Sequence, residues 1–122
     1  MAAPALSVAL VDDDPSLCRS LGRLLRAAGI GSKAYRSAEA FLADPDPPRF
    51  DCMVFDVQLG GMSGIDLGLW LAAEGATAPI IFVTAYDDAE TRARAERAGC
   101  AGFFHKCDSG AGVLEAIRRV AS

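Results

Sequence analysis

The stretch Cys52-Met53-Val54-Phe55-Asp56 decides the fold, because four apolar residues in a row end in a carboxylate. A strand buried on both faces of a parallel sheet reads as a short apolar run of this kind. Ligands of open α/β sheets bind outside the carboxyl ends of the strands, which is where Asp56 would lie. A single Asp in such a place is more simply a turn-capping residue. A functional role for Asp56 therefore depends on the residues at the ends of the other strands.

Two further apolar runs end in polar side chains. Residues 8–11 are apolar and are followed by three acids at 12–14, and residues 80–83 are apolar and are followed by Thr84. We interpret Asp14 as the N-cap of the following helix, with Pro15 at its first position, rather than as a third metal ligand. The pattern of an apolar strand that ends in a polar residue thus recurs along the chain.

Strand and helix signals alternate five times. Apolar runs predict strands at about 7–11, 51–56, 80–84 and 102–105, and alternating residues at 32–35 predict a short strand near the edge of the sheet. Cap residues and helical periodicity predict helices at about 15–28, 38–43, 64–74, 88–98 and 109–120. Asp87 or Asp88 would cap the fourth helix, and Asp108 or Ser109 the fifth. We therefore expect an α/β fold with a single doubly wound parallel sheet, formed as one domain by residues 1–122.

Composition excludes several classes of protein. A chain of 122 residues is about one domain long, and its net charge of -4 argues against a chain that coats nucleic acid. The four cysteines form no CxxC pair, so buried thiols are favoured over disulfides or a metal cluster. The amino terminus does not read as a secretory signal, and no apolar run approaches the ~20 residues of a membrane span. We expect a soluble, reduced, cytoplasmic protein with no membrane contact.

The strand ends that carry Asp12, Asp13, Asp56, Thr84 and Lys106 should converge on one edge of the sheet. Carboxylates that meet at one place repel each other unless a cation joins them, and Mg²⁺ prefers such oxygen ligands. A lysine can bind phosphate as a point charge, and a threonine hydroxyl can donate to a phosphoryl oxygen. Phosphoryl transfer depends mainly on positioning and charge neutralisation, so this set of side chains suits it. Asp56 is the best candidate for the nucleophile.

With this set of residues, the chain resembles the receiver domain of two-component response regulators. The resemblance covers about residues 7–120 and rests on four segments in a fixed order, which are Val11-Asp12-Asp13-Asp14-Pro15-Ser16, Asp56-Val57-Gln58-Leu59 with Gly61-Met62-Ser63-Gly64, Thr84-Ala85, and Ala98-Gly99-Cys100-Ala101-Gly102-Phe103 with Lys106. It implies a (βα)5 flavodoxin-like fold with strand order 2-1-3-4-5.

The resemblance also implies roles at the acidic edge. Asp56 would accept a phosphoryl group from a sensor histidine kinase, a phosphotransfer protein or a small phosphodonor. Asp13, Asp56 and the backbone carbonyl of Gln58 would ligate Mg²⁺ directly, and Asp12 would hold a metal-bound water. Lys106 would bind the phosphoryl oxygens together with a threonine hydroxyl. Such a domain is not an enzyme in the ordinary sense, because it catalyses only its own phosphorylation and dephosphorylation.

The same resemblance implies a switch. Thr84 would bind the phosphoryl oxygens and move toward them, and Phe103 would rotate into the space that the threonine leaves. The face formed by the fourth helix, the fifth strand and the fifth helix would then change its affinity for partners, including a possible second copy of the chain. A local change of charge would thereby bias a two-state element. No nucleic-acid contact by this domain is implied.

Two residues depart from the family pattern. Cys107 stands where the family has a proline that follows a cis bond, and Gly60 stands where the family has another proline. A cis bond without proline costs about 3 kcal/mol, so we predict a trans Lys106–Cys107 bond and a shifted loop. Glycine at position 60 predicts a looser loop after Asp56. We further hypothesise that Gln58 and Tyr86 flank the phosphorylation site and limit the access of water to it.

Two other functions compete with a phosphorylation-controlled switch. A phosphohydrolase with an aspartyl nucleophile would carry a second acid two residues later, but Gln58 stands there. A degenerate receiver could serve only as a dimerisation or interaction module. The intact set of Asp12, Asp13, Asp56, Thr84 and Lys106 argues against it, whereas the missing prolines leave it open.

Overall fold

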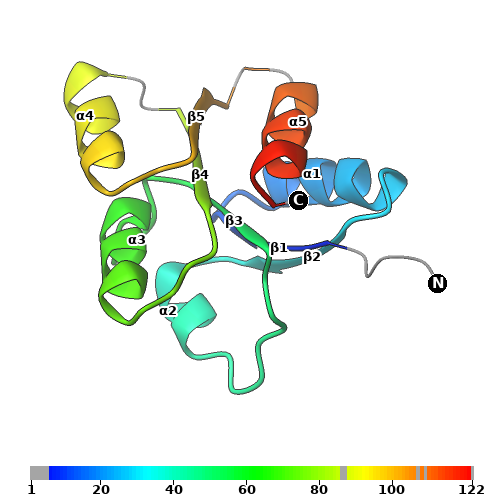
Figure 1. The fold of residues 1–122 in the computed structure, drawn as a ribbon, viewed down its shortest axis with the longest axis horizontal. Helices are drawn as coiled ribbons and strands as arrows, with labels where there is room; N and C mark the ends of the chain where they lie inside the picture. The colour runs from blue at the N-terminus through cyan, green and yellow to red at the C-terminus, as the bar shows by residue number, and fades with distance from the viewer. Residues whose placement is uncertain (1–5, 86–87, 107, 109, 122) are drawn as a thin grey trace.

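The protein is a parallel five-stranded sheet between two layers of helices (Figure 1). The computed structural model describes residues 6–85, 88–106, 108 and 110–121. The strands are β1 (Ser7–Val11), β2 (Gly31–Tyr35), β3 (Cys52–Phe55), β4 (Ile80–Thr84) and β5 (Gly102–His105), and the helices are α1 (Pro15–Ala27), α2 (Ala38–Leu42), α3 (Gly64–Ala73), α4 (Ala89–Arg97) and α5 (Gly110–Ala121). The sheet is parallel, as the residue pattern predicted, and its strand order is β2-β1-β3-β4-β5, as the family resemblance implied.

The period of two along each strand divides the core between the two faces of the sheet. In β1, Val8 and Leu10 belong to the apolar cluster that contains the buried residues of α1 and α5. Ala9 and Val11 belong to the cluster that contains the buried residues of α2, α3 and α4. Figure 1 shows the same division, with α1 and α5 on one side of the sheet and α2, α3 and α4 on the other. Helices therefore cover both faces of the sheet, which explains why β1, β3 and β4 read as continuous apolar runs, whereas β2 at the edge is largely exposed.

Side-chain caps begin α1 to α4 where the sequence predicted them, and the Asp108 carboxylate, a candidate cap of α5, accepts a hydrogen bond from the His105 N–H at 2.9 Å. The Asp14 carboxylate accepts hydrogen bonds from the backbone N–H groups of Ser16 and Leu17 at the start of α1. Asp88, one of the two candidate caps of α4, accepts a bond from the N–H of Thr91 at 2.8 Å. Asp87 and Ser109 lie outside the described residues. These caps fix where each helix leaves the carboxyl end of a strand, and with it the edge that carries the polar residues.

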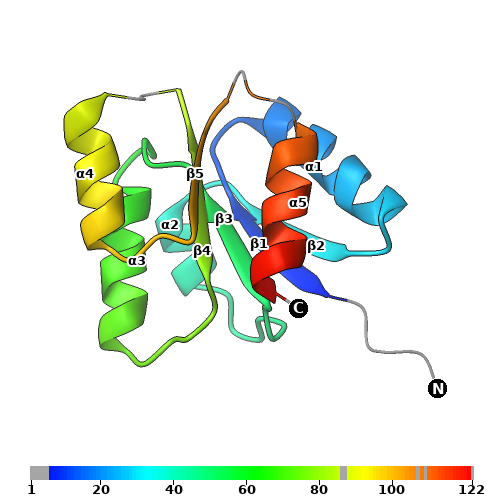
Figure 2. The same cartoon turned by 45° about the horizontal axis from the view of Figure 1, so that its top comes forward.

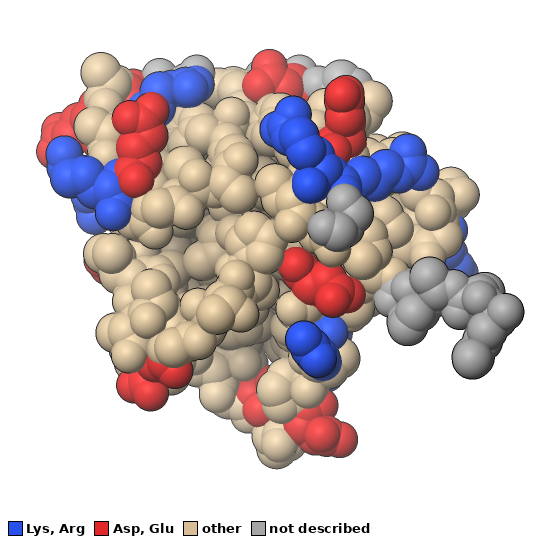
Figure 3. Space-filling view, in the orientation of Figure 1, with Lys and Arg blue, Asp and Glu red and all other residues tan. Residues whose placement is uncertain are grey.

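The strands run in the same direction, so their carboxyl ends form one edge of the sheet. The carboxyl ends of β4 and β5 lie toward the top of Figure 2. In the part of the chain that the structure describes, no helix is long and apolar enough to cross a membrane. Figure 3 shows acidic and basic side chains interspersed over one face, with both signs alternating over α4 at the upper left.

Candidate functional site

The site lies at the carboxyl edge, where the sheet positions its residues through the backbone. The Asp12 N–H donates to the Tyr35 carbonyl at 3.0 Å, and the Asp56 N–H donates to the Val11 carbonyl at 2.9 Å. The Lys106 N–H donates to the Thr84 carbonyl at 3.0 Å. The hydrogen-bonded pairing of the sheet thus continues one residue beyond β1, β3 and β5. The polar side chains therefore start from fixed points rather than from mobile loops.

The buried polar side chains of the described residues all belong to this edge. They are Asp12, which is 4% exposed, Asp56, which is 4% exposed, and Thr84, which has no exposed surface. Burying a carboxylate is costly unless a cation or hydrogen-bond donors compensate the charge. Two buried acids at the same edge therefore require nearby positive charge.

Lys106 supplies part of that charge. Its Nζ lies 2.9 Å from Asp56 Oδ2 and 3.2 Å from Asp12 Oδ1, so a single ammonium group bridges both acids. Burial alone would lower the pKa of Lys106, but the hydrogen bond with Asp56 and the charges of both acids raise it overall. The lysine is therefore held in its charged form.

One ammonium group does not fully compensate two buried carboxylates. Burial, together with the nearby charge of Asp56, raises the pKa of Asp12 from 3.8 to about 6, although the backbone N–H of Asp14 and the Lys106 ammonium oppose the shift. This direction is the one expected of an acid that lacks sufficient positive charge around it. A further cation at the site would be strongly favoured.

The acids are placed to hold such a cation. Carboxylate oxygens of Asp12, Asp13 and Asp56 all lie within 4.8 Å of one another, and Asp13 is exposed while the other two are buried. The Gln58 N–H donates to Asp56 Oδ1 at 3.1 Å, which brings the backbone of residue 58 to the edge of this cluster. The donor set consists of oxygens alone, which suits a hard divalent ion such as Mg²⁺.

The two predicted switch residues lie on neighbouring strands. Thr84 ends β4 and is paired with His105 of β5, while Phe103 of β5 is paired with Phe82 of β4. Phe103 is partly buried against the apolar cluster on the α2, α3 and α4 side of the sheet. The guanidinium carbon of Arg92 in α4 lies 4.7 Å from the centre of its ring. The aromatic side chain therefore connects the sheet to α4.

Sequence reasoning missed one residue next to the site. Glu39 of α2 accepts a hydrogen bond from the backbone N–H of Met62, in the loop between β3 and α3, at 2.9 Å. The two residues are 23 positions apart and share no motif, so no local pattern could have joined them. The predictions about Tyr86 and the Lys106–Cys107 bond concern residues 86 and 107, which lie outside the described part of the chain.

Comparisons with known proteins agree with this geometry. Residues 8–118 match the family model of the response regulator receiver domain. The chain is 37% identical over 109 residues to the response regulator protein TmoT of Ectopseudomonas mendocina. The aligned region covers 89% of this chain and 50% of TmoT. It is 34% identical over 114 residues to the transcriptional regulatory protein FixJ of Azorhizobium caulinodans, and this alignment covers 93% of this chain and 54% of FixJ.

Solved structures show the same relationship in three dimensions. The crystal structure of FixJ-N superposes with a TM-score of 0.85 at 32% identity, and the match covers 98% of this chain and 95% of that one. The structure of the response regulator StyR superposes with a TM-score of 0.86 at 36% identity, covering 97% of this chain and 60% of StyR. The chain spans about half the length of the curated relatives that it matches.

Proposed function

This chain belongs to the response regulator receiver family, and on that premise we propose that Asp56 is the residue that accepts the phosphoryl group. The observation that carries the proposal is the placement of Lys106, whose ammonium lies 2.9 Å from Asp56 and 3.2 Å from Asp12 at a buried strand end. Such a group would stabilise the negative charge that develops on a transferring phosphoryl group. Asp56 follows the central strand β3 and faces this cation directly.

The transfer is a substitution at phosphorus. A carboxylate oxygen of Asp56 forms a bond to phosphorus, while the bond from phosphorus to the donor breaks and the donor keeps the electron pair. The product is an aspartyl phosphate, whose phosphoryl group carries about -1.5 to -2 of charge. Because the Asp56 carboxylate loses its own negative charge when the bond forms, the edge gains about -0.5 to -1. Lys106 binds the phosphoryl oxygens as a charge, and the hydroxyl of Thr84 donates to one of them. Both groups position the phosphoryl group in line with the attacking oxygen.

Three oxygen donors of the chain would hold Mg²⁺ directly, namely Asp13, Asp56 and the carbonyl of Gln58. Asp12 would contact the ion through a bound water. The clustering of the three acids within 4.8 Å and the raised pKa of Asp12 both support a cation at this place. When bound, Mg²⁺ neutralises charge on the phosphoryl oxygens. The acids then no longer repel the incoming phosphoryl group.

The output of the domain is a change of surface. Thr84 moves toward the phosphoryl group, Phe103 rotates into the space that it leaves, and the face of α4, β5 and α5 rearranges. The contact of Arg92 with the Phe103 ring at 4.7 Å supports a link between that ring and α4. A second copy of the chain is a candidate partner for this face. The domain modifies only itself, so it acts by binding rather than by turning over an external substrate.

The phosphodonor is a sensor histidine kinase or a phosphotransfer protein, as is general for receiver domains. Residues 1–122 form one receiver domain in this proposal, which the family match over 8–118 supports. The net charge of -4 supports an absence of direct nucleic-acid binding by the domain. On the basis of the family alone, we assign it to the cytoplasm.

Phosphorylation by a small donor tests the proposal without knowledge of the kinase. The purified chain is incubated with acetyl phosphate, with and without Mg²⁺, and the phosphorylated fraction is measured by intact mass. We expect labelling that requires Mg²⁺ and is absent in Asp56→Asn. Asp51→Asn is the matched control, because Asp51 lies at the other end of β3, where its Oδ2 accepts a bond from the Ser7 N–H.

The outcomes separate the competing functions. Labelling of the wild-type chain and of Asp51→Asn, but not of Asp56→Asn, supports a phosphoacceptor switch. Labelling that persists in Asp56→Asn would show that another residue accepts the group. No labelling of the wild-type chain at any Mg²⁺ concentration would favour a degenerate receiver that acts only as an interaction module.

A further inference from the structure

The loop between β3 and α3 is hydrogen-bonded to a side chain of α2. Glu39 lies in the first turn of α2, and its Oε2 accepts the N–H of Met62 at 2.9 Å. This hydrogen bond lowers the pKa of Glu39, because an N–H donor favours the charged carboxylate. A hydrogen bond to a charged acceptor is stronger than one between neutral groups. The contact therefore ties the loop to α2.

Gly61 makes this approach possible. Its φ is +91°, a conformation that other L-residues rarely adopt, and a Cβ at this position would lie 2.8 and 3.1 Å from the two carboxylate oxygens of Glu39. A side chain at residue 61 would push the carboxylate away from the Met62 N–H. The loop backbone is thus shaped to receive the side chain of Glu39.

Glu39 is a fixed anchor because α2 is attached firmly to the sheet. Ala38 has no exposed surface, and the ring of Phe41 packs 5.1 Å from the ring of Tyr35 in β2 and 5.9 Å from that of Phe55 in β3. Phe55 directly precedes Asp56. The acidic cluster and the anchor are therefore built on the same rigid core.

The loop is also held by the buried side chains of Val57 and Leu59 in the apolar cluster, and its other hydrogen bonds are local. The Gln58 N–H bonds to the side chain of Asp56, and the Gly64 N–H bonds to the Val57 carbonyl at 3.0 Å. Gly60, between Gln58 and Met62, is exposed, and a Cβ built on it would meet nothing within 4 Å. Glycine leaves the backbone more freedom than proline would. The contact from Glu39 thus restrains the segment that lacks a proline.

We propose that Glu39 is a positioning residue for the Mg²⁺ site, which it serves by holding the loop that carries the Gln58 carbonyl. This role rests on the proposed function, because it presumes that Gln58 is a metal ligand. Outer-shell partners of metal ligands commonly change metal affinity when they are removed. Glu39 bonds to the Met62 N–H and is not one of the clustered acids Asp12, Asp13 and Asp56.

Two measurements on the whole chain test this role. Hydrogen exchange at the Met62 amide, followed by NMR without Mg²⁺, reports the contact itself. Calorimetric titration with MgCl₂ reports the Kd of the metal. The variants are Glu39→Ala, Glu39→Gln, whose amide oxygen can still accept the bond, and the control Glu115→Gln, which removes one negative charge from the exposed face of α5.

We expect Met62 exchange to be fastest in Glu39→Ala and intermediate in Glu39→Gln. The Mg²⁺ Kd should rise about threefold to tenfold in Glu39→Ala and less in Glu39→Gln, and it should stay unchanged in Glu115→Gln. An unchanged Kd in Glu39→Ala would overturn the role of Glu39 and leave the proposed function intact. A wild-type chain that binds no Mg²⁺ would instead overturn the metal site.

A double-mutant cycle tests whether Glu39 affects the Mg²⁺ Kd by restraining the loop between β3 and α3. Gly60 does not have a positive φ, and a Cβ there would meet nothing within 4 Å, so Gly60→Pro introduces neither positive-φ strain nor a clash at Cβ and would stiffen the loop by another means. In the Gly60→Pro background, Glu39→Ala should change the Mg²⁺ Kd by less than about twofold, because the two restraints are partly redundant. An equal effect of Glu39→Ala in both backgrounds would contradict positioning through the loop.

Discussion

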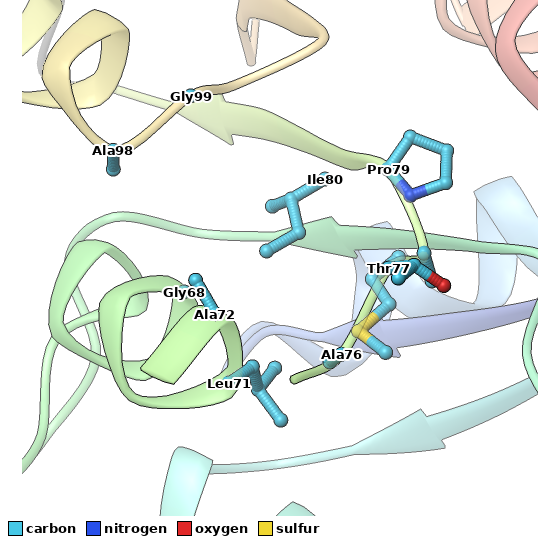
Figure 4. A pocket seen from close by; sticks show the side chains of 11 residues that line it. Gly68, Leu71, Ala72, Ala76, Thr77, Pro79, Ile80, Ala98 and Gly99 are labelled. Carbon is cyan, nitrogen blue, oxygen red and sulfur yellow. The ribbon is translucent and has the colours of Figure 1, made fainter. Parts of the chain in front are cut away.

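The two ends of the sheet are built in opposite ways. The carboxyl end buries Asp12, Asp56 and Thr84, which are the buried polar residues among those described. The amino end of β3 and β4 instead borders a cavity of about 200 Å³ between α3, the start of β4 and the end of α4. Among the residues labelled in Figure 4, only Thr77 contributes a side-chain oxygen to its lining.

The two ends should contribute differently to stability. Apolar groups buried at the amino end contribute to folding through the hydrophobic effect, at roughly 25 cal/mol per Å². Acids buried at the carboxyl end cost free energy, which one lysine offsets in part. Buried acids that lower stability in this way are commonly found at functional sites. Replacing a buried acid at the carboxyl end should therefore stabilise the metal-free fold, whereas a loss of apolar packing at the amino end should destabilise it.

The largest effect is expected from Gly64→Ala, at the start of α3 beside Asp56. A Cβ at residue 64 would lie 2.0 Å from the carbonyl oxygen of Asp56, so the backbone of the loop must shift. We expect the free energy of unfolding to fall by about 3 kcal/mol or more, as for the most disruptive single substitutions. Urea denaturation measures the change. A loss of less than about 1 kcal/mol would show that the loop does not pack closely against Asp56.

Removal of the bridging cation should have the next largest effect. Lys106→Met leaves Asp12 and Asp56 without their ammonium partner, and the phosphorylation rate with acetyl phosphate should fall about 10-fold to 100-fold. Lys33→Met is the matched control, because Lys33 is the other lysine of the chain and pairs with Asp44 at 2.7 Å, near the surface. Equal rates in the two variants would contradict a specific role of Lys106.

Asp12→Asn should stabilise the metal-free fold. The pKa of Asp12 is raised from 3.8 to about 6 by burial and by Asp56, so the folded state binds a proton at Asp12 more tightly than the unfolded state does. Keeping Asp12 ionised at about pH 7 therefore costs stability, and the neutral amide should recover on the order of 2 kcal/mol. Urea denaturation at about pH 7.5 without Mg²⁺ measures the gain.

The pH dependence of that gain checks its cause. Below about pH 6 the folded wild-type chain takes up a proton at Asp12, so the advantage of Asp12→Asn should shrink between about pH 7 and about pH 4.5. The variant should also bind Mg²⁺ more weakly than the wild-type chain. A gain that stays constant over this pH range would trace the stabilisation to something other than the charge of Asp12.

The smallest effect is expected at the amino end, from Gly68→Ala. This residue lies four positions after Gly64 in α3, but its Cβ would meet only Ile80 Cδ1 at 3.3 Å and Phe82 at 3.7 Å. A side-chain methyl can yield by a few tenths of an ångström, and alanine gains about 1 kcal/mol of helix propensity over glycine. We expect a change in stability within about 1 kcal/mol of zero. A loss as large as that of Gly64→Ala would refute the contrast between the two ends.

The strands of the sheet could be predicted from the sequence because the residues that indicate each strand are close together in the chain. The apolar run and the polar residue that ends it lie within about six positions of each other, so the sequence alone could assign Asp56, Thr84 and Lys106 to one edge. The caps Asp14, Ser37, Ser63 and Asp88 are equally local signals. Parallel topology then brought these local signals together.

Features that depend on contacts between distant side chains could not be predicted in this way. The pairing of Glu39 with Met62 depends on how α2 packs on the sheet, and no periodicity encodes it. The orientation of α3 was also unpredictable, because the helix is apolar on several sides. The structure buries Ile65 and Leu67 and leaves Leu69 and Trp70 exposed by 49% and 44%. Only the tertiary fold decides between such faces.

Chemical mapping of the acceptor residue tests the central claim most directly. After incubation with acetyl phosphate and Mg²⁺, borohydride reduction converts an aspartyl phosphate to homoserine, and peptide mass spectrometry locates the converted residue. The account predicts homoserine at position 56 and at no other acid, with none formed when Mg²⁺ is omitted. Conversion at Asp12 or Asp13 in place of Asp56, or equal conversion without Mg²⁺, would contradict it.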